Sequence, residues 1–313
     1  MTQAQLLSRQ KVAVIGLGGI GGGMAGQLML AGKHDVTICT RNPLDVMTFE
    51  SGERAARLPL NTLADPAGAS PVDWVILSTK AHDTGATAPW FARLCNSRTR
   101  VAVLQNGVEH EARVQPMCPT AEILPAIVYY NGERIRPDHF RMRRVTDYEL
   151  AVPAGDLADA FSALLDGTEF RIFKSDDFKT MQWRKLLVNV VANPVTALTR
   201  QRLGVLHRDS IKELCLAVLD EAVEVGRAAG ARFDENEAQR TLDTVLTYPG
   251  DAGTSMYFDC LASKPLEIEA LTGAIVAAGK RFQVLTPLNS ALLALLKAIS
   301  DANENTVSSN VSV

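Results

Sequence analysis

The sequence has no apolar run of about 18 residues or more, so it predicts no membrane-spanning helix. The segment Met1–Gln10 also lacks the apolar centre of a signal peptide. A formal net charge of −3 gives no electrostatic reason to expect nucleic acid or an anionic membrane as a partner. We therefore expect a cytoplasmic protein with no nucleic acid and no membrane among its partners.

Cysteine and histidine are few and scattered. The five cysteines never form a CxxC pair, which favours buried free thiols in a reducing compartment. The five histidines show no HExxH or comparable spacing, so we expect no metal site. With 313 residues, 47% hydrophobic and 21% charged, the chain is long enough for two globular domains, each with its own core.

The first half begins with the pattern of a dinucleotide-binding fold. A β-branched strand at Lys11–Ile15 leads into Gly16-Leu17-Gly18-Gly19-Ile20-Gly21. A helical stretch, Met24–Ala31, and a second strand, Asp35–Cys39, follow. In this context the glycine turn holds a pyrophosphate at the helix N-terminus. The alternative, a merely glycine-rich turn, does not explain the strand, helix and strand around it.

The residues after the second predicted strand favour one dinucleotide. NAD-binding folds usually place a carboxylate there to hold the ribose 2′-hydroxyl. Here the residues are Thr40-Arg41-Asn42, and the Arg41 guanidinium can pair with a 2′-phosphate through two hydrogen bonds. The sequence therefore favours NADP(H), the alternative being that Arg41 is a solvated surface arginine.

Two further predicted strands, Trp74–Ser78 and Val101–Leu104, end in polar residues that include Lys80 and Asn106. Ligands of open α/β sheets bind at the carboxyl ends of the strands. Lys80 and Asn106 are therefore candidates for contact with the nicotinamide half of the cofactor or with the substrate. A generic loop lysine and a turn-forming Asn-Gly are the alternatives.

The remaining pattern predicts an α/β N-terminal Rossmann-like domain, with a doubly wound and mainly parallel sheet, followed by an all-α domain. Antiparallel strands that extend the sheet are expected near Ala121–Tyr130, Arg134–Met142 and Tyr148–Val152. A helix around Ala86–Cys95, a helix around Leu157–Leu165 and a last strand at Glu169–Phe173 complete that domain. Later helices are expected at Asp209–Ala229, Leu266–Arg281 and Pro287–Ile299. We place an NADP-binding domain at 1–175, a helical substrate domain at 176–303 and a disordered tail at 304–313.

The first helix of the second domain carries a polar stripe. It is apolar almost all round from Trp183 to Pro194, but Lys185, Asn189 and Asn193 recur at four-residue steps and so share one face. Polar groups in apolar surroundings are costly without partners, so the stripe indicates an interdomain hydrogen-bonded seam or a polar cleft. We expect it to face the nucleotide fold. Pro194 disfavours helical geometry at Asn193 and predicts a break there.

These motifs, in this order, resemble those of the ketopantoate reductase family over nearly the whole chain. The matching segments are Gly16–Gly21, Thr79–Ala81, Gln105–Gly107, Trp183–Leu186, Asn189, Asn193–Leu198, Thr254–Met256 and Leu266–Glu269. The resemblance implies an NADPH-dependent oxidoreductase that reduces 2-dehydropantoate to (R)-pantoate. This reaction is a step of pantothenate biosynthesis and hence of coenzyme A biosynthesis.

The resemblance also implies roles for individual residues. Lys185 looks like the general acid, because an ammonium can stabilise and protonate the alkoxide that hydride transfer creates. Glu267 looks like an active-site residue that pairs with Lys185 or orients the cofactor ribose, the alternative being a solvated helix residue. Substrate binding is implied for Asn106, Asn189, Asn193 and Ser255, and cofactor contacts for Gly16–Gly21, Asn106, Lys80 and Glu267.

Two segments depart from the family pattern. Ser263-Lys264-Pro265-Leu266 stands where the family usually has Gly-Arg before Thr-Glu-Ile-Asp, and Leu271-Thr272-Gly273 replaces Ile-Asn-Gly. Both flank the substrate side, so the reaction type is better determined than the particular 2-oxo acid. Since Lys-x-x-x-Asn also occurs in β-hydroxyacid dehydrogenases, the alternatives are a reductase or dehydrogenase of another 2-oxo or 3-hydroxy acid, and a non-catalytic NADPH-sensing module. We expect a small-molecule 2-oxo acid as partner and leave a homodimer open.

Overall fold

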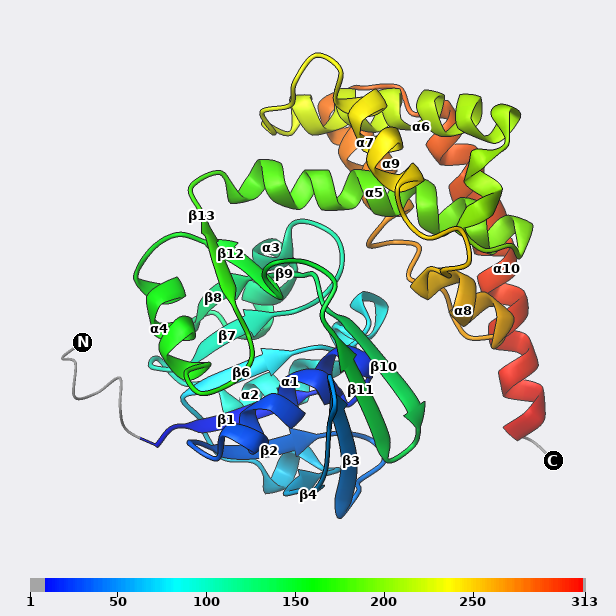
Figure 1. The fold of residues 1–313 in the computed structure, drawn as a ribbon. Coiled ribbons are helices and arrows are strands. Elements are labelled where there is room, and N and C mark those ends of the chain that lie inside the picture. Colours follow the sequence, from blue (N-terminus) through cyan, green and yellow to red (C-terminus); the bar gives the residue numbers. More distant parts are fainter. Residues whose placement is uncertain (1–8, 312–313) are drawn as a thin grey trace. The chain divides into compact units, whose positions relative to one another are not determined.

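The computed structural model describes the backbone of residues 9–311 and the side chains of residues 9–304. The chain divides into two compact units, Met1–Phe178 and Lys179–Val313, whereas the expected boundary lay between residues 175 and 176. Figure 1 shows that the first unit is built of sheets and helices and the second of helices. Within the described residues, no helix is long and apolar enough to cross a membrane.

The first unit is organised around a six-stranded sheet in the order β5-β2-β1-β6-β7-β8, in which every pair is parallel. Its strands are β1 (Lys11–Ile15), β2 (Asp35–Cys39), β5 (Thr62–Leu63), β6 (Trp74–Leu77), β7 (Arg100–Val103) and β8 (Glu122–Pro125). From β1 the chain moves outward to β2 on one side and later to β6 on the other. The carboxyl end of β1 is therefore the switch point at which such sheets bind ligands.

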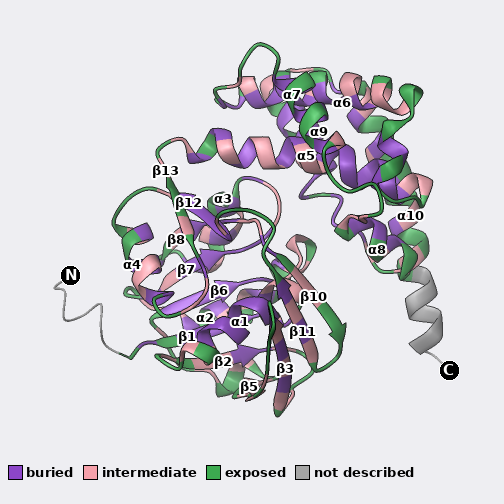
Figure 2. Cartoon of the chain, viewed as in Figure 1, coloured by how far each residue is buried: buried purple, intermediate pink, exposed green. Residues whose placement is uncertain are grey.

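Both faces of this sheet are buried, which explains the continuous apolar runs of its strands. Successive side chains of a strand point to opposite faces. Val12 and Val14 belong to the core cluster that contains helix α1 (Gly19–Ala31), and Ala13 and Ile15 belong to the cluster that contains helix α2 (Ala88–Leu94). Figure 2 shows the central strands and α1 buried. The expected doubly wound, mainly parallel sheet is confirmed.

The segments after β7 do not extend this sheet as antiparallel strands, so that expectation was wrong. The strand β8 joins it in parallel, and the later strands form two other sheets. One sheet, in the order β10-β11-β3-β4, contains β3 (Val46–Ser51), β4 (Arg54–Pro59), β10 (Asn131–Arg136) and β11 (His139–Arg143). The other, in the order β13-β12-β9, contains β9 (Ile127–Val128), β12 (Leu150–Pro153) and β13 (Ile172–Ser175). Period-two alternation marks a strand without specifying its partner, and the partners β3 and β4 had not been predicted.

A glycine-rich face of α1 lets the β10-β11-β3-β4 sheet approach the helix closely. A methyl group added at Gly22 would lie 2.2 Å from a ring carbon of Phe140, and one at Gly26 would lie 2.4 Å from a ring carbon of Phe49. At the start of α1 the contact is between backbones, because a methyl group on Gly19 would lie 2.0 Å from the carbonyl oxygen of Gly132. The β10–β11 hairpin is thus packed directly against the first turn of α1.

We predict that Gly132→Ala destabilises the first unit by about 1–3 kcal/mol, because its new methyl group would lie 2.4 Å from the carbonyl oxygen of Gly19 and neither backbone can yield cheaply. Thermal and urea unfolding followed by circular dichroism measure the effect. Gly85→Ala is the matched control, since that exposed glycine has open space around an added methyl group. Equal stability of the two variants would contradict the packing assigned to Gly132.

The two other α-helices of the first unit are α3 (His110–Val114) and α4 (Asp156–Leu164). The α-helices of the second unit are α5 (Phe178–Thr199), α6 (Asp209–Ala228), α7 (Glu237–Leu246), α8 (Ser255–Leu261), α9 (Thr272–Phe282) and α10 (Pro287–Val311).

Two helix boundaries in the second unit differ from expectation. The helix expected from Leu266 begins only at Thr272, because the preceding residues form turns closed by a hydrogen bond from Gly273 N to Ile268 O (2.8 Å). The segment 304–313, expected to be a disordered tail, is helical as far as Val311, and residues 312–313 lie outside the described part. After Pro287 the sequence has no glycine or proline to end the helix.

Candidate active site

The glycine turn between β1 and α1 uses three glycines for three different reasons. Gly16 has a φ of 98°, a conformation that side chains disfavour. Gly21 packs so closely that a methyl group there would lie 2.0 Å from the carbonyl oxygen of Gly16. Gly18 stands at the N-cap of α1, and nothing lies within 4 Å of a methyl group added to it. An anion could therefore reach the backbone N–H groups at the start of α1.

The other residues of the turn belong to the protein's interior. Leu17 is 5% exposed and forms part of the core, and Ile20 is half-buried against the same cluster. The carbonyl oxygen of Ile20 accepts a hydrogen bond from the hydroxyl of buried Tyr130 (2.6 Å). The first turn of α1 is therefore held from the side of the β10–β11 hairpin, which keeps its N–H groups in a fixed direction.

Arg41, Lys80 and Asn106 all follow carboxyl ends of strands in the same parallel sheet, namely β2, β6 and β7. Arg41 is exposed, whereas Lys80 and Asn106 are half-buried. The side-chain amide of Gln105 donates to the carbonyl oxygen and to the hydroxyl of Thr79 (both 3.1 Å), which ties the loop after β7 to the loop after β6. The structure thus brings these three residues and the glycine turn to one edge of the sheet.

In the second unit, the polar stripe lies on α5. Asn193 Nδ2 donates to Asn189 Oδ1 (3.3 Å), and Asn193 Oδ1 accepts from the backbone N–H of Met256 (3.4 Å). The helix runs through Pro194 without interruption, so the break expected at Asn193 is wrong. Although Pro194 removes one helical hydrogen bond, burial of neighbours such as Val190 outweighs the local preference.

The contact with Met256 brings α8 to the stripe. Thr254, the N-cap of α8, accepts from the backbone N–H of Tyr257 (3.1 Å), and its hydroxyl also bonds to that of Thr196 on α5 (2.8 Å). Ser255 is the first residue of α8 and is exposed. Three of the predicted substrate-binding residues, Asn189, Asn193 and Ser255, are therefore held together by contacts between α5 and α8.

Lys185 lies on α5, one helical turn before Asn189, and is half-buried. Burial lowers the pKa of its ammonium group below the ordinary lysine value. Such a group gives up its proton more readily than a solvated lysine. Glu267 is 5% exposed and lies in the turns before α9, so its reading as a solvated helix residue is wrong.

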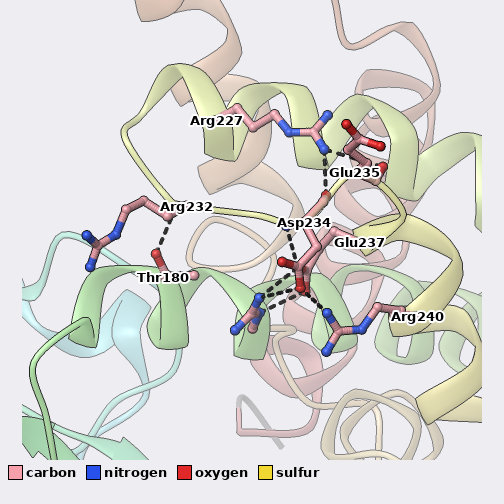
Figure 3. A network of polar contacts seen from close by, with 8 residues as sticks. Thr180, Arg227, Arg232, Asp234, Glu235, Glu237 and Arg240 are labelled. Carbon is pink, nitrogen blue, oxygen red and sulfur yellow. Dashed lines mark hydrogen bonds and ion pairs between the residues drawn. The ribbon is translucent and has the colours of Figure 1, made fainter.

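A charged network next to Lys185 was not predicted from the sequence. Arg184 on α5 donates to both carboxylate oxygens of Glu237 (2.8 and 2.9 Å). The Glu237 side chain is only 4% exposed, whereas that of Arg184 is 42% exposed. Figure 3 shows that the acidic group also includes Asp234, and that Arg232 N donates to Thr180 Oγ1 (2.8 Å) nearby. The start of α5 is therefore fixed to the segment between α6 and α7.

We predict that Arg184→Met lowers the free energy of unfolding of the second unit by about 3 kcal/mol, because it leaves the buried Glu237 carboxylate without its guanidinium partner. Arg240→Met is the matched control. Arg240 pairs with Asp234, and both side chains are about half-exposed (53% and 54%), so this loss should cost less than about 1 kcal/mol. Chemical denaturation of both variants measures the difference. If both variants lost a similar free energy of unfolding, the buried Glu237 carboxylate would not be the reason for the loss in Arg184→Met.

No group of three or more His, Cys, Asp or Glu side chains in the described part of the chain could hold a metal ion. The site features instead define a class. A glycine turn at the switch point of a parallel sheet characterises dinucleotide-binding proteins, and here a helical unit with a lysine–asparagine stripe follows it.

Comparisons with known proteins identify the family. The model for Ketopantoate reductase PanE/ApbA matches residues 12–155, and the model for its C-terminal part matches residues 177–300. The 2-dehydropantoate 2-reductase of Mycobacterium tuberculosis is 36% identical over 292 residues, which cover 93% of this chain and 98% of the relative. That of Caulobacter vibrioides is 33% identical over 287 residues, 92% of this chain and 98% of the relative. This chain belongs to the ketopantoate reductase family and is an oxidoreductase, as the resemblance implied.

The fold agrees with this assignment. The solved structure of a dimeric ketopantoate reductase from Staphylococcus aureus superimposes with a TM-score of 0.83 at 26% identity, covering 94% of this chain and 99% of that one.

Proposed function

We propose that the chain reduces 2-dehydropantoate to (R)-pantoate with NADPH, a step of pantothenate and coenzyme A biosynthesis. One observation carries the proposal: Lys185, with its lowered pKa, shares a helix face with Asn189 and Asn193 in a chain whose full-length relatives are 2-dehydropantoate 2-reductases. A non-catalytic NADPH sensor would have no use for this proton donor.

The residues of the first unit fit NADP(H). The open approach to Gly18 and the N–H groups at the start of α1 suit a pyrophosphate. The exposed guanidinium of Arg41, at the end of β2, suits a 2′-phosphate. Lys80 and Asn106, at the ends of β6 and β7, are the proposed contacts for the nicotinamide half. When bound, the reduced nicotinamide supplies the hydride that reduces C2 of the substrate.

Residues of the second unit are proposed to donate the proton and to bind the substrate. As the carbonyl oxygen at C2 gains negative charge, the Lys185 ammonium stabilises it and donates a proton to it. Asn189, Asn193 and Ser255 offer neutral hydrogen bonds to the carboxylate and hydroxyl groups of the substrate, without a second charge that would compete with Lys185. We assign the buried Glu267 to the same site, where a carboxylate would hold either Lys185 or the cofactor ribose.

We also infer a cytoplasmic enzyme that forms homodimers. All five cysteines are free thiols and four of them are buried, which suits a reducing compartment. The solved S. aureus relative is described as dimeric.

A panel of 2-oxo acids with NADPH and NADH tests the proposed function. We expect the highest kcat/KM with 2-dehydropantoate and NADPH, because the relatives are named for that substrate and the exposed guanidinium of Arg41 suits a 2′-phosphate. If a simple aliphatic 2-oxo acid or a 3-hydroxy acid ranked first, the reductase or dehydrogenase of another acid would replace this proposal. Failure to oxidise NADPH with any of these acids would favour the sensing module.

Lys185→Ala should lower kcat by about 10²–10⁴-fold, the usual loss when a general acid is removed. Its affinity for NADPH, measured by titration without substrate, should change little. Lys179→Ala is the matched control, since Lys179 is an exposed lysine on the same helix. Full kcat in Lys185→Ala would remove that residue from its assigned role.

The pH dependence of kcat/KM tests the role of Lys185 as proton donor independently. The acid form donates the proton, so kcat/KM should be high below the pKa of Lys185 and fall as the pH rises through it. Because burial lowers this pKa, the fall should come at a lower pH than for a solvated lysine. The fall should be absent from the residual activity of Lys185→Ala.

A further inference from the structure

An ion pair crosses the glycine turn of the first unit. Arg41 follows β2, and Asp83 is the last residue of a short 3₁₀ helix (Ala81–Asp83) that follows β6. In the sheet, β2 and β6 lie on either side of β1, the strand that leads into the turn. Arg41 Nη2 lies 3.7 Å from Asp83 Oδ2, so the pair joins the two strand ends that flank the turn.

The ion pair between Arg41 and Asp83 is weak, so another anion can replace Asp83 as the partner of Arg41. The side chain of Arg41 is 89% exposed and that of Asp83 is 36% exposed, so water and salt weaken their attraction. The separation of 3.7 Å is also longer than a charge-assisted hydrogen bond. An anion of higher charge that binds next to Arg41 would therefore displace Asp83 from the guanidinium with little loss of free energy.

The two nicotinamide dinucleotides differ at this point. NADPH carries a 2′-phosphate with close to two negative charges and three acceptor oxygens, which a guanidinium can bind through two hydrogen bonds. NADH carries a neutral hydroxyl there, which cannot displace a carboxylate from Arg41. Only the phosphorylated cofactor must therefore compete with Asp83 for the guanidinium.

We propose that Asp83 is a cofactor-specificity residue, which holds Arg41 when no 2′-phosphate is bound and reduces the preference for NADPH over NADH by competing for that guanidinium. The inference rests on the NADP(H) binding in the proposed function. The inference adds to the proposed function that Asp83 determines how strongly the protein prefers NADPH to NADH. Asp83 acts through Arg41 and needs no contact with the reacting atoms.

The test is calorimetric titration of the full-length protein with NADPH and NADH, without substrate. Asp83→Asn should tighten NADPH binding by about 2- to 5-fold, the range expected when one exposed ion pair is removed, and leave NADH unchanged. Arg41→Ala should weaken NADPH far more than NADH. Adding Asp83→Asn to Arg41→Ala should then give no further gain, because the guanidinium for which the two anions compete is gone.

Glu53→Gln is the charge-matched control. It removes one negative charge from an exposed position in the turn between β3 and β4 and should leave both affinities unchanged. Adenosine 2′,5′-bisphosphate and AMP serve as second probes. Only the bisphosphate should gain affinity in Asp83→Asn.

Three results would overturn the proposal: no gain for NADPH in Asp83→Asn, an equal change for both dinucleotides, or a gain that persists in the Arg41→Ala background. The last would mean that Asp83 repels the cofactor without acting through Arg41. Because these titrations need no substrate, they are independent of the reaction. A protein that follows the expected binding pattern but does not reduce 2-dehydropantoate would refute the substrate assignment and leave the role of Asp83 standing.

Discussion

The close approach of backbones at the start of α1 is the constraint on which the first unit depends. Gly19 meets Gly132 without side chains between them, while the Tyr130 hydroxyl holds the carbonyl oxygen of Ile20. The same helical turn offers the N–H groups proposed to bind pyrophosphate. A hairpin more than a hundred residues later in the chain therefore fixes the direction of these groups. Gly19 and Gly22 consequently serve packing, beside the glycines that serve the turn itself.

In the second unit, the polar stripe of α5 is part hydrogen-bonded scaffold and part candidate binding surface. Asn193 donates to Asn189 and accepts from Met256 N, which uses one acceptor and one donor of its amide. The bond between them occupies Asn189 only through its oxygen, so both N–H donors of Asn189 are left for other partners. Asn193 therefore also positions α8 and Ser255 and keeps one N–H donor for a substrate, whereas Asn189 keeps both of its N–H donors. The hydrogen bonds of the stripe join α5 to α8 within the second unit.

Local patterns in the sequence predicted the strand, glycine turn and helix between Lys11 and Ala31, because the residues that determine these elements are neighbours in the chain. The helix begins at Gly19, five residues before the expected start at Met24. Features that depend on distant partners were missed. Alternation marked the strands after β7, but not that β10 and β11 join β3 and β4. Glu237 lies 53 residues from Arg184, and neither position reveals the other in the sequence. The break expected before Pro194 failed for a related reason, since burial of α5 outweighs a local backbone preference.

The two cations proposed for function occupy opposite electrostatic environments. Arg41 is exposed beside the partly exposed carboxylate of Asp83, so it keeps its charge and can exchange one anionic partner for another. Lys185 is desolvated, so its charged form is disfavoured and its proton is easier to release. An exposed lysine at 185 would hold its proton more tightly, and a buried arginine at 41 would need a permanent partner. Solvent exposure therefore separates the two roles: the exposed cation suits recognition of an anion, and the half-buried cation suits donation of a proton.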